Sequence, residues 1–460
     1  MLFKNATVIT MDPKRRIITG GAVAVRGSRI EAVGKSRDLG RKFSGDETID
    51  LRGGLLMPGL IDSHVHLAQA MLRGCAENLS HDPWLTERVW PLEGSYEGGD
   101  GRISAELCIL EMLKSGTTTF LETFLAAQYG IDAILQVIRD SGIRSCVSKL
   151  IMDVPSLAGE ENAMFHGMRE DLQSTLRQAR EMHAKWDGAE DGRIRIWLGP
   201  RGPGGSSEEG LRTVVKVARE LDTGINIHFC EIEEQRVFIR DTYGCSPTEL
   251  MERIGMVGKN VLLIHAVWVD PEDIERIATT GTHVVHNPSA NTKMGSGIAR
   301  IPDMILAGVN VVLGCDGGPS NNTHDMIREM RIGSYIHKGV HRDASIMPAE
   351  TMLEMATING AKMLGAEEEI GSIEPGKRAD LTAVDMRRPH LVPAPDPVGT
   401  LVASANGSDV SHVMVDGRLL VRRGKVLTMD ENGILKRVAK AARELYARTD
   451  VKIPIAWPVE

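Results

Sequence analysis

Short runs of hydrophobic and β-branched residues alternate with longer helical segments through the middle of the chain. Eight such runs occur, at residues 55–66, 117–123, 143–150, 193–200, 224–231, 260–267, 282–288 and 310–317. The segments between them, such as 103–116 and 211–222, have hydrophobic residues at helical spacing and end at Gly or a polar residue. Strand and helix alternating eight times predict an α/β fold, a (β/α)₈ TIM-type barrel over residues 56–379.

The two ends of the chain have a different pattern. Residues 1–55 contain short strands rich in Val and Ile, and residues 380–430 contain similar strands separated by Gly turns. We therefore expect a composite domain, a small β-sandwich built from both chain ends. Hydrophobic residues at helical spacing over 434–449 predict a closing helix, so residues 431–460 are expected to form a C-terminal helix and tail.

Composition and charge narrow the class of protein. The 460 residues are 42% hydrophobic and 25% charged, which is typical of a soluble globular chain and excludes a disordered chain, a collagen or a coiled coil. The net charge of −8 argues against nucleic acid as a partner. We also expect no membrane helix and no secretory signal, because no hydrophobic run is long enough. The six cysteines are scattered, which indicates a reducing compartment and hence the cytoplasm.

Histidine and carboxylate residues stand at the ends of several predicted strands, where Val, Ile and Leu are the usual residues. These residues are His64, His66, His228, Glu231, His265, His286 and Asp316. Barrel enzymes carry their chemistry at the C-terminal ends of the strands. We therefore expect these side chains to converge on one mouth of the barrel.

The first and fifth strands supply a candidate metal site. His64 and His66 point to the same side of a strand because side chains alternate, and two such imidazoles form a natural pair of ligands for zinc. His228 suits a third ligand, and Glu231 suits a general acid or base. The alternative for His228 and Glu231 is a strand-end histidine followed by an acidic helix start.

The remaining candidates each have a structural alternative as well. His265 interrupts a hydrophobic strand, where a lone histidine is more often a core residue. Asp316 is costly to bury unless it is paired or bound to a metal, but it could also cap the next helix. One metal site explains these residues together better than separate structural roles do. His286 precedes a loop and could orient a neighbouring residue rather than bind anything itself.

The other histidines and the cysteines are expected in ordinary structural positions. Surface, loop or helix positions are expected for His81, His166, His183, His324, His337, His341, His390 and His412. Cys230 and Cys315 neighbour the candidate site, but we expect them to be buried small hydrophobic side chains.

Several segments carry a family resemblance. PGLIDSHVH, IHFCE, IHAV, HNPSAN and GCDGGPSNN, in this order, resemble the amidohydrolase superfamily, and in particular its branch of deaminases and chlorohydrolases. That branch includes S-adenosylhomocysteine and methylthioadenosine deaminases, guanine and 8-oxoguanine deaminases, and triazine hydrolases. The later GSIEPGKRADLTAVD resembles the segment in which these chains return from barrel to sandwich. The likeness covers nearly the whole chain.

The resemblance implies one divalent metal ion, with zinc expected first and iron as the alternative. Its implied ligands are His64, His66, His228 and Asp316. Glu231 matches the glutamate that transfers a proton, and His265 matches the histidine that helps to polarise the reacting centre. Asp316 or Glu231 would give a proton to the leaving amine. Trp84 matches an aromatic residue that often lines the substrate pocket.

Two features depart from relatives. Members of the superfamily with two metals bridge them with a carbamylated lysine at the end of the fourth strand, but this strand ends in GPRGPGG and Lys149 lies on the third. We therefore expect a mononuclear site. Arg201 stands where nucleoside deaminases of this branch often have a substrate-contacting histidine. Arg201 would bind a carbonyl, a carboxylate or a phosphate of the substrate, or else face solvent.

Together these expectations describe a metal-dependent hydrolytic deaminase of an amino-substituted nitrogen heterocycle, of the purine nucleoside, purine, pterin or triazine type. Metal-bound hydroxide would attack the ring carbon and ammonia would leave. The first alternative is a triazine-type chlorohydrolase or alkylamine-releasing hydrolase with the same site. The presence of Glu231 favours deamination, because a chloride leaving group needs no proton. A non-catalytic scaffold is a more distant alternative, and a homo-oligomer is compatible with the sequence.

Overall fold

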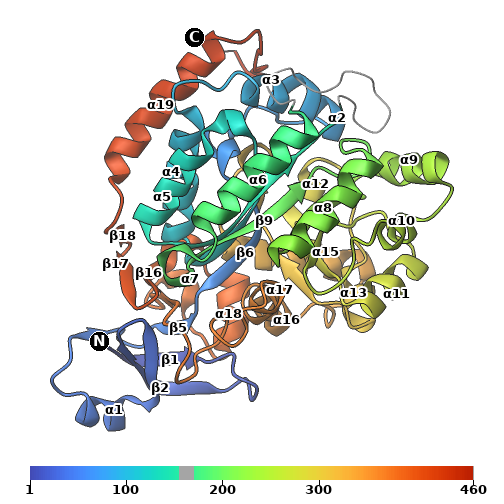
Figure 1. Cartoon of the computed structure of the whole chain (residues 1–460). Coiled ribbons are helices and arrows are strands. Elements are labelled where there is room, and N and C mark those ends of the chain that lie inside the picture. Colours follow the sequence, from blue (N-terminus) through green and yellow to red (C-terminus); the bar gives the residue numbers. More distant parts are fainter. Residues whose placement is uncertain (155–169, 459–460) are drawn as a thin grey trace.

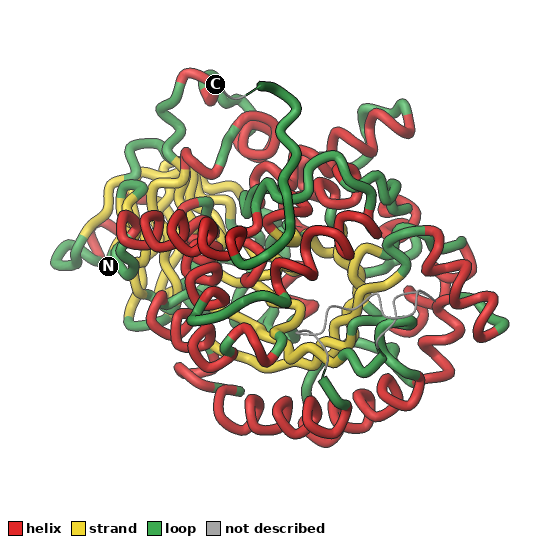
Figure 2. The backbone as a smooth tube through the Cα atoms, turned by 90° about the horizontal axis from the view of Figure 1, so that it is seen from above, coloured by secondary structure: helices red, strands yellow, loops and turns green. Residues whose placement is uncertain are grey.

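The computed structural model describes residues 1–154 and 170–458, and one of its two nine-stranded sheets is a ring of parallel strands (Figure 2). In chain order these strands are β6 (Leu60–His66), β7 (Thr117–Leu125), β8 (Arg144–Ile151), β9 (Ile194–Pro200), β10 (Ile225–Phe229), β11 (Val261–His265), β12 (His283–His286), β13 (Val311–Leu313) and β14 (Asp316–Gly317). Strand β13 pairs with β12, and β14, which follows shortly after, pairs with β6. The two short strands thus form the eighth side of the ring, and the predicted TIM-type barrel is confirmed.

Helices connect successive strands and cover the outside of the ring (Figure 1). The larger ones up to β13 are α4 (Asp100–Lys114), α5 (Ile131–Ser141), α6 (Leu172–Trp186), α8 (Glu208–Leu221), α9 (Glu233–Tyr243), α10 (Pro247–Ile254), α11 (Pro271–Thr280), α12 (Pro288–Lys293) and α13 (Ile301–Leu306). After β14 come α14 (Gly318–Asn321), α15 (Met326–His341), α16 (Ala349–Met355), α17 (Ile358–Met363), α18 (Pro397–Ser404) and α19 (Glu431–Ala447). In the described part of the chain, no helix combines the length and the apolarity that crossing a membrane requires.

Shorter helical elements fill the loops. They are α1 (Ser36–Lys42), η1 (Leu67–Leu72), α2 (His81–Trp84), η2 (Leu85–Val89), α3 (Trp90–Glu93), η3 (Ala127–Tyr129), α7 (Ala189–Gly192), η5 (Pro389–Leu391) and η6 (Gly407–Asp409). Elements η1 to α3 lie between β6 and the first long barrel helix, α4. This loop after the first strand therefore carries a large part of the structure at the mouth of the barrel.

Local sequence signals fix the limits of the barrel helices. Helix α11 begins with a capping box between Asp270 and Asp273 and has Pro at its start. It ends at Gly281, whose φ of 72° is left-handed and favours glycine. Such short, well-defined ends let each helix return the chain to the next parallel strand.

Both ends of the chain contribute to a second sheet. Its strands are β1 (Leu2–Ile9), β2 (Ile17–Arg26), β3 (Arg29–Lys35), β4 (Thr48–Asp50), β5 (Leu55–Pro58), β15 (Leu381–Val384), β16 (Val410–Val415), β17 (Arg418–Arg422) and β18 (Lys425–Val426). Strand β5 joins the two ends, because it pairs with β1 on one side and with β15 on the other. The structure thus shows one sheet shared by the two ends; its folding into a two-layered sandwich, and the domain limits, remain predictions.

The first hydrophobic run, expected as one barrel strand over 55–66, is two strands. Residues 55–58 form β5 of the shared sheet, and the barrel begins with β6. The chain crosses between the sheets at Gly59, where a Cβ atom would lie only 2.0 Å from Oγ1 of Thr118. Both strands are buried and apolar, so hydrophobicity alone does not reveal the change of sheet.

Ion pairs join the shared sheet and the closing helix to the barrel. Arg144, at the start of β8, lies 2.7 Å from Oδ2 of Asp380 and 2.8 Å from Oδ1 of Asp416, and its side chain is 11% exposed. Helix α19 lies along α4, where Glu431 pairs with Lys114 at 2.6 Å. The barrel is thus fixed to segments from the far end of the chain.

Candidate active site

The residues predicted to bind a metal and to catalyse lie together at the C-terminal ends of the barrel strands. His64 and His66 are on β6, His228 is on β10, His265 ends β11, and Asp316 begins β14. All of them are buried, as is Glu231, which follows β10. The structure therefore brings the predicted side chains to one mouth of the barrel.

The spacing of the ligand atoms fits one metal ion. Oδ1 of Asp316 lies 3.3 Å from Nε2 of His64 and 3.4 Å from Nε2 of His66. A tetrahedral ion with bonds of about 2.0–2.2 Å places neighbouring ligand atoms about 3.3–3.6 Å apart. His64, His228 and His265 form a second group whose ligand atoms lie within 4.8 Å of one another. Nε2 of His64 and Nδ1 of His228 are buried with no hydrogen-bond partner among the described residues. The donor set and its unpaired nitrogens therefore fit a divalent cation.

Neighbouring residues hold His64 in position. Its Nδ1 contacts Oγ1 of Thr123 on β7, which leaves Nε2 facing the ligand cluster. Oδ1 of Asp62 accepts hydrogen bonds from the backbone N–H of Cys315 at 2.9 Å and of His64 at 3.4 Å. Asp62 thus ties β6 to the segment just before Asp316, and the two sides of the candidate metal site stay in register.

The electrostatics of the cluster favour metal binding. Burial lowers the pKa of His66 and of His228 well below the usual value, so both imidazoles are neutral and can act as ligands. Burial acts to raise the pKa of Asp316, but His64 and His66 outweigh it and hold the pKa well below its usual range. The site therefore presents the neutral imidazoles of His66 and His228 beside the carboxylate of Asp316.

The Glu231 carboxylate lies between two histidines. Its Oε2 is 3.5 Å from Nε2 of His265 and 3.3 Å from Nε2 of His81. Nδ1 of His265 lies 2.9 Å from Oδ1 of Asn291 and 3.1 Å from Nδ2 of Asn287. Asn287 follows β12 and Asn291 lies in α12, so the segment after the seventh strand orients the imidazole of the sixth.

The backbone at the site is strained and closely packed. His265 and Asp316 both have left-handed φ values, 72° and 69°. At Gly314, a Cβ atom would lie 2.7 Å from Oδ1 of Asn287 and 2.8 Å from Cβ of His64. The turn before Asp316 thus approaches β6 so closely that glycine is required there.

A small cavity opens beside the cluster, and the two predicted substrate contacts line it. Its walls are formed by His66, Gln69, Trp84, Leu85, Trp90, Glu93, Phe124, Arg201, His228, Glu231, His265, Met294 and Asp316. Trp84 donates a hydrogen bond from Nε1 to the carbonyl oxygen of Pro319 at 3.2 Å. The Arg201 guanidinium lies 5.9 Å from the Trp90 ring centre and 5.5 Å from that of Phe124, within reach of cation–π attraction.

Sequence reasoning missed two polar residues at this site. His81 was expected at a surface, loop or helix position, but it is buried against Glu231. Glu93 is buried in the wall of the cavity, and burial raises its pKa to about 7. The signal that could have revealed both is their position in the segment around Trp84, which the resemblance already placed near the substrate.

Other histidines and both cysteines are accounted for by the structure. His286 contacts Nε2 of His337 at 3.3 Å, so it does not orient a ligand of the cluster directly. His324 and His337 are helix-flanking or helical residues, but both are buried. Cys230 and Cys315 are free and buried, as expected. His166 lies outside the described residues.

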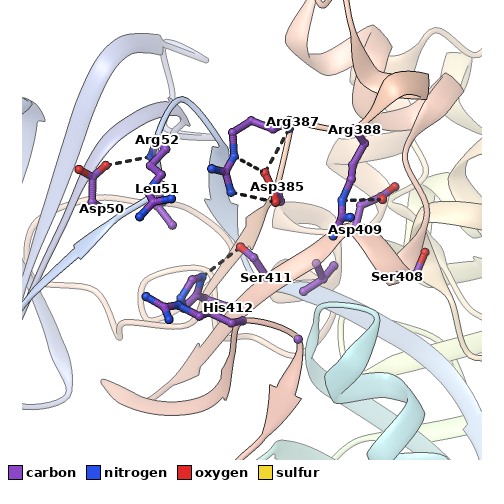
Figure 3. Close-up of a pocket in the computed structure, with 13 residues that line it drawn as sticks. Asp50, Leu51, Arg52, Asp385, Arg387, Arg388, Ser408, Asp409, Ser411 and His412 are labelled. Carbon is purple, nitrogen blue, oxygen red and sulfur yellow. Dashed lines mark hydrogen bonds and ion pairs between the residues drawn. The ribbon is translucent and has the colours of Figure 1, made fainter.

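A larger hollow of about 560 Å³ lies elsewhere, at the shared sheet (Figure 3). Its walls combine arginines with aspartates: Arg387 donates to Asp385 at 2.9 Å and 3.1 Å, and Arg388 lies 3.9 Å from Oδ1 of Asp409. Because much of this charge is already paired, and the metal-ligand cluster lies at the barrel mouth, the hollow is not the candidate active site.

The chain is similar to known proteins along nearly its whole length. Residues 55–420 match the amidohydrolase family, and the chain belongs to this family. A 5'-deoxyadenosine deaminase from Methanosarcina acetivorans is 36% identical over 450 residues, which cover 98% of this chain and 99% of the relative. A 5-methylthioadenosine/S-adenosylhomocysteine deaminase from Desulforudis audaxviator is 38% identical over 445 residues, which cover 97% of this chain and 99% of the relative.

Solved structures show the same fold over nearly the whole chain. An adenosine deaminase from Xanthomonas campestris with bound zinc has a TM-score of 0.90 at 28% identity, covering 97% of this chain and 98% of that one. A zinc-bound atrazine chlorohydrolase from Arthrobacter aurescens has a TM-score of 0.88 at 27% identity, covering 96% and 99%. The predicted family, its deaminase and chlorohydrolase branch, and the class of hydrolytic deaminase are therefore confirmed.

Proposed function

We propose that the protein is a zinc-dependent deaminase that removes the amino group from the purine ring of an adenosine-type nucleoside, with 5'-deoxyadenosine and methylthioadenosine as the first candidates. The observation that carries the proposal is the buried cluster of His64, His66, His228 and Asp316 with the Glu231 carboxylate beside it. The deaminase names of relatives that match end to end support the choice of reaction and substrate.

The metal centre follows from the donor atoms. His64, His66, His228 and Asp316 would hold one ion, and when bound this ion would activate a water molecule as the nucleophile. Zinc is the choice because it accepts imidazole nitrogen and carboxylate oxygen together, and because solved neighbours bind it. Lys149 pairs with Glu170 at 2.7 Å and is not part of the cluster, which supports a single ion.

Glu231 would transfer the protons of the reaction, and His265 would stabilise the charge that develops in it. Oε1 of Glu231 is buried with no hydrogen-bond partner in the described part of the chain, so it is available to take a proton from the nucleophile and pass it to a ring nitrogen. His265, oriented by Asn291, would stabilise charge that develops at the attacked ring carbon. Glu231 or Asp316 would then protonate the leaving amine.

The side chains that line the cavity suit a flat ring with polar substituents. Trp84, Trp90 and Phe124 supply aromatic surface, while Glu93 and Arg201 supply hydrogen-bonding groups. A carboxylate accepts hydrogen bonds from hydroxyl groups, and a guanidinium binds carbonyl or carboxylate oxygens. These groups match the ring and the hydroxyl groups of a nucleoside.

A triazine hydrolase is the second candidate, because solved chlorohydrolases share this fold. The test is ammonia release by the zinc-loaded protein from 5'-deoxyadenosine, methylthioadenosine, S-adenosylhomocysteine, adenosine, guanine and amino-triazines, with chloride release from atrazine measured in parallel. Ammonia from the adenosine-type compounds that stops with a chelator would support the proposal. Chloride release without nucleoside deamination would replace it with the second candidate.

Two further expectations accompany this function. We propose a cytoplasmic enzyme, because the six cysteines are free thiols and are not paired in disulfides. A homo-oligomer is also compatible with the sequence. The mass of the purified protein in solution will show its oligomeric state. The expected partners are the small heterocyclic substrate and the metal ion.

A further inference from the structure

His81 and Asp82 form a short polar chain that reaches the proposed catalytic glutamate. His81 begins α2, is 3% exposed, and places Nε2 3.3 Å from Oε2 of Glu231. Its other nitrogen, Nδ1, lies 2.6 Å from Oδ1 of Asp82, whose side chain is 43% exposed. The chain therefore runs from the partly exposed Asp82 through a buried imidazole to a buried carboxylate.

The contact with His81 gives the two carboxylate oxygens of Glu231 different surroundings. Oε2 lies at ion-pair distance from Nε2 of His81 on α2 and of His265 on β11, at 3.3 Å and 3.5 Å. Oε1 is buried and, within the described residues, has no hydrogen-bond partner. Because both imidazoles lie beside Oε2, Oε1 is the oxygen of Glu231 that is available to accept a proton during the reaction.

We propose that His81, held by Asp82, is a positioning residue that fixes the Glu231 carboxylate so that Oε1 is presented to the nucleophile and the substrate ring. His81 acts through Glu231 and needs no contact with the substrate. It also ties α2 to the end of β10, and the His81 ring stacks near that of Trp84, with ring centres 6.3 Å apart. His81 thus fixes the position of α2, which carries Trp84, relative to the Glu231 carboxylate.

The charges around His81 agree with this role. Burial acts to lower its pKa and Arg201 adds to that, but the Glu231 charge and the hydrogen bond to Asp82 outweigh both and raise the pKa to about 9. Burial acts to raise the pKa of Glu231, but His265 and His81 hold it well below its usual range. At neutral pH the pair is therefore an imidazolium beside a carboxylate, which is the form of Glu231 that accepts a proton.

The first test uses kinetics of the zinc-loaded enzyme and rests on the proposed function. His81→Gln should lower kcat about tenfold or more with KM within about threefold, because positioning acts on the step and not on binding. The acid limb of the kcat profile should move to higher pH, since Glu231 loses a neighbouring cation and its pKa rises. Asp82→Asn should show smaller changes of the same kind. His341→Gln, on an exposed histidine, is the matched control and should change nothing.

The second test needs no substrate. The ring resonance of His81 in the zinc-loaded protein, identified as the one that shifts in Asp82→Asn, should titrate near pH 9 and at least one pH unit lower in Glu231→Gln. Equal titration in both proteins, or an unchanged kcat and acid limb in His81→Gln, would overturn the proposal. If the wild-type protein deaminates no nucleoside, the resonance still decides the coupling, so failure of the function is distinguished from failure of this inference.

Discussion

At the scale of single residues, the site is defined by buried polar atoms that the protein itself leaves unpaired. Nε2 of His64, Nδ1 of His228 and Oε1 of Glu231 have no hydrogen-bond partner among the described residues. An unpaired buried polar atom costs about 1–3 kcal/mol, so a protein keeps several together only when something else binds them. The unpaired nitrogens fit the metal ion, and the unpaired oxygen fits the proton that Glu231 would move.

Replacing Glu231 tests whether this residue carries the proton. Glu231→Gln should reduce turnover of the best substrate by about 10²–10⁴-fold, because the amide cannot accept and release a proton. Metal content, measured by atomic emission, should stay at that of the wild type, since Glu231 is not among the four proposed ligands. A variant that keeps its full rate would remove Glu231 from the mechanism.

Arg201 is expected to set preference between substrates. Arg201→Met should raise KM for S-adenosylhomocysteine, which carries a carboxylate, about tenfold or more, because a hydrogen bond to a charged group is worth about 1.5–3 kcal/mol. KM for the uncharged 5'-deoxyadenosine should change much less. Steady-state kinetics on the two compounds, with zinc content as the control, measure the difference. Equal changes for both would assign Arg201 to packing against Trp90 and Phe124.

The sequence predicted residues that stand at strand ends better than residues in loops. His64, His228 and Asp316 interrupt hydrophobic strands. Polar residues at the C-terminal ends of barrel strands indicate an active site. His81 belongs to a four-residue helix in the loop after β6, and its spacing from Glu231 is 150 residues along the chain. Only the folded loop shows that the two side chains meet.

At the scale of elements, the close approach of β6 and the turn before β14 brings the proposed ligands together. Gly314→Ala would place a Cβ atom 2.9 Å from the backbone nitrogen of His64, so one strand must shift. We expect zinc affinity to fall at least about tenfold while the far-ultraviolet circular dichroism spectrum is retained. Gly40→Ala, where no atom lies within 4 Å, is the control and should bind zinc normally. A wild-type zinc affinity in Gly314→Ala would show that the turn can shift without weakening zinc binding.

The order of elements was more predictable than their limits. Alternating hydrophobic runs and helical segments indicated the barrel, because parallel strands buried on both faces are continuously apolar. The same property hid the passage from β5 to β6 at Gly59, since both strands are apolar and buried. The pairing of the two chain ends was predictable from their shared strand pattern, whereas their strand order depends on contacts that lie hundreds of residues apart.

At the scale of the whole molecule, buried charge fixes the barrel to the shared sheet. Arg144→Met would leave Asp380 and Asp416 without their main cation, and breaking a buried ion pair costs about 3–5 kcal/mol. We therefore expect a clear fall in the denaturation midpoint in urea. Arg26→Met, which removes an exposed pair with Glu31 at 3.0 Å, should change the midpoint far less. Equal midpoints would mean that the contact adds no stability.

Metal binding should stabilise the whole fold, because the proposed ligands come from β6, β10 and β14 and are assembled only in the folded chain. A ligand present at a hundred times its Kd stabilises by about 2.7 kcal/mol, so removal of the metal by a chelator should lower Tm by several degrees, and added zinc should restore it. Calorimetry measures the shift. Glu231→Gln should keep the zinc-dependent shift, because the four ligands remain. His64→Ala should lose it, and a full shift in that variant would mean that the ion binds elsewhere in the protein.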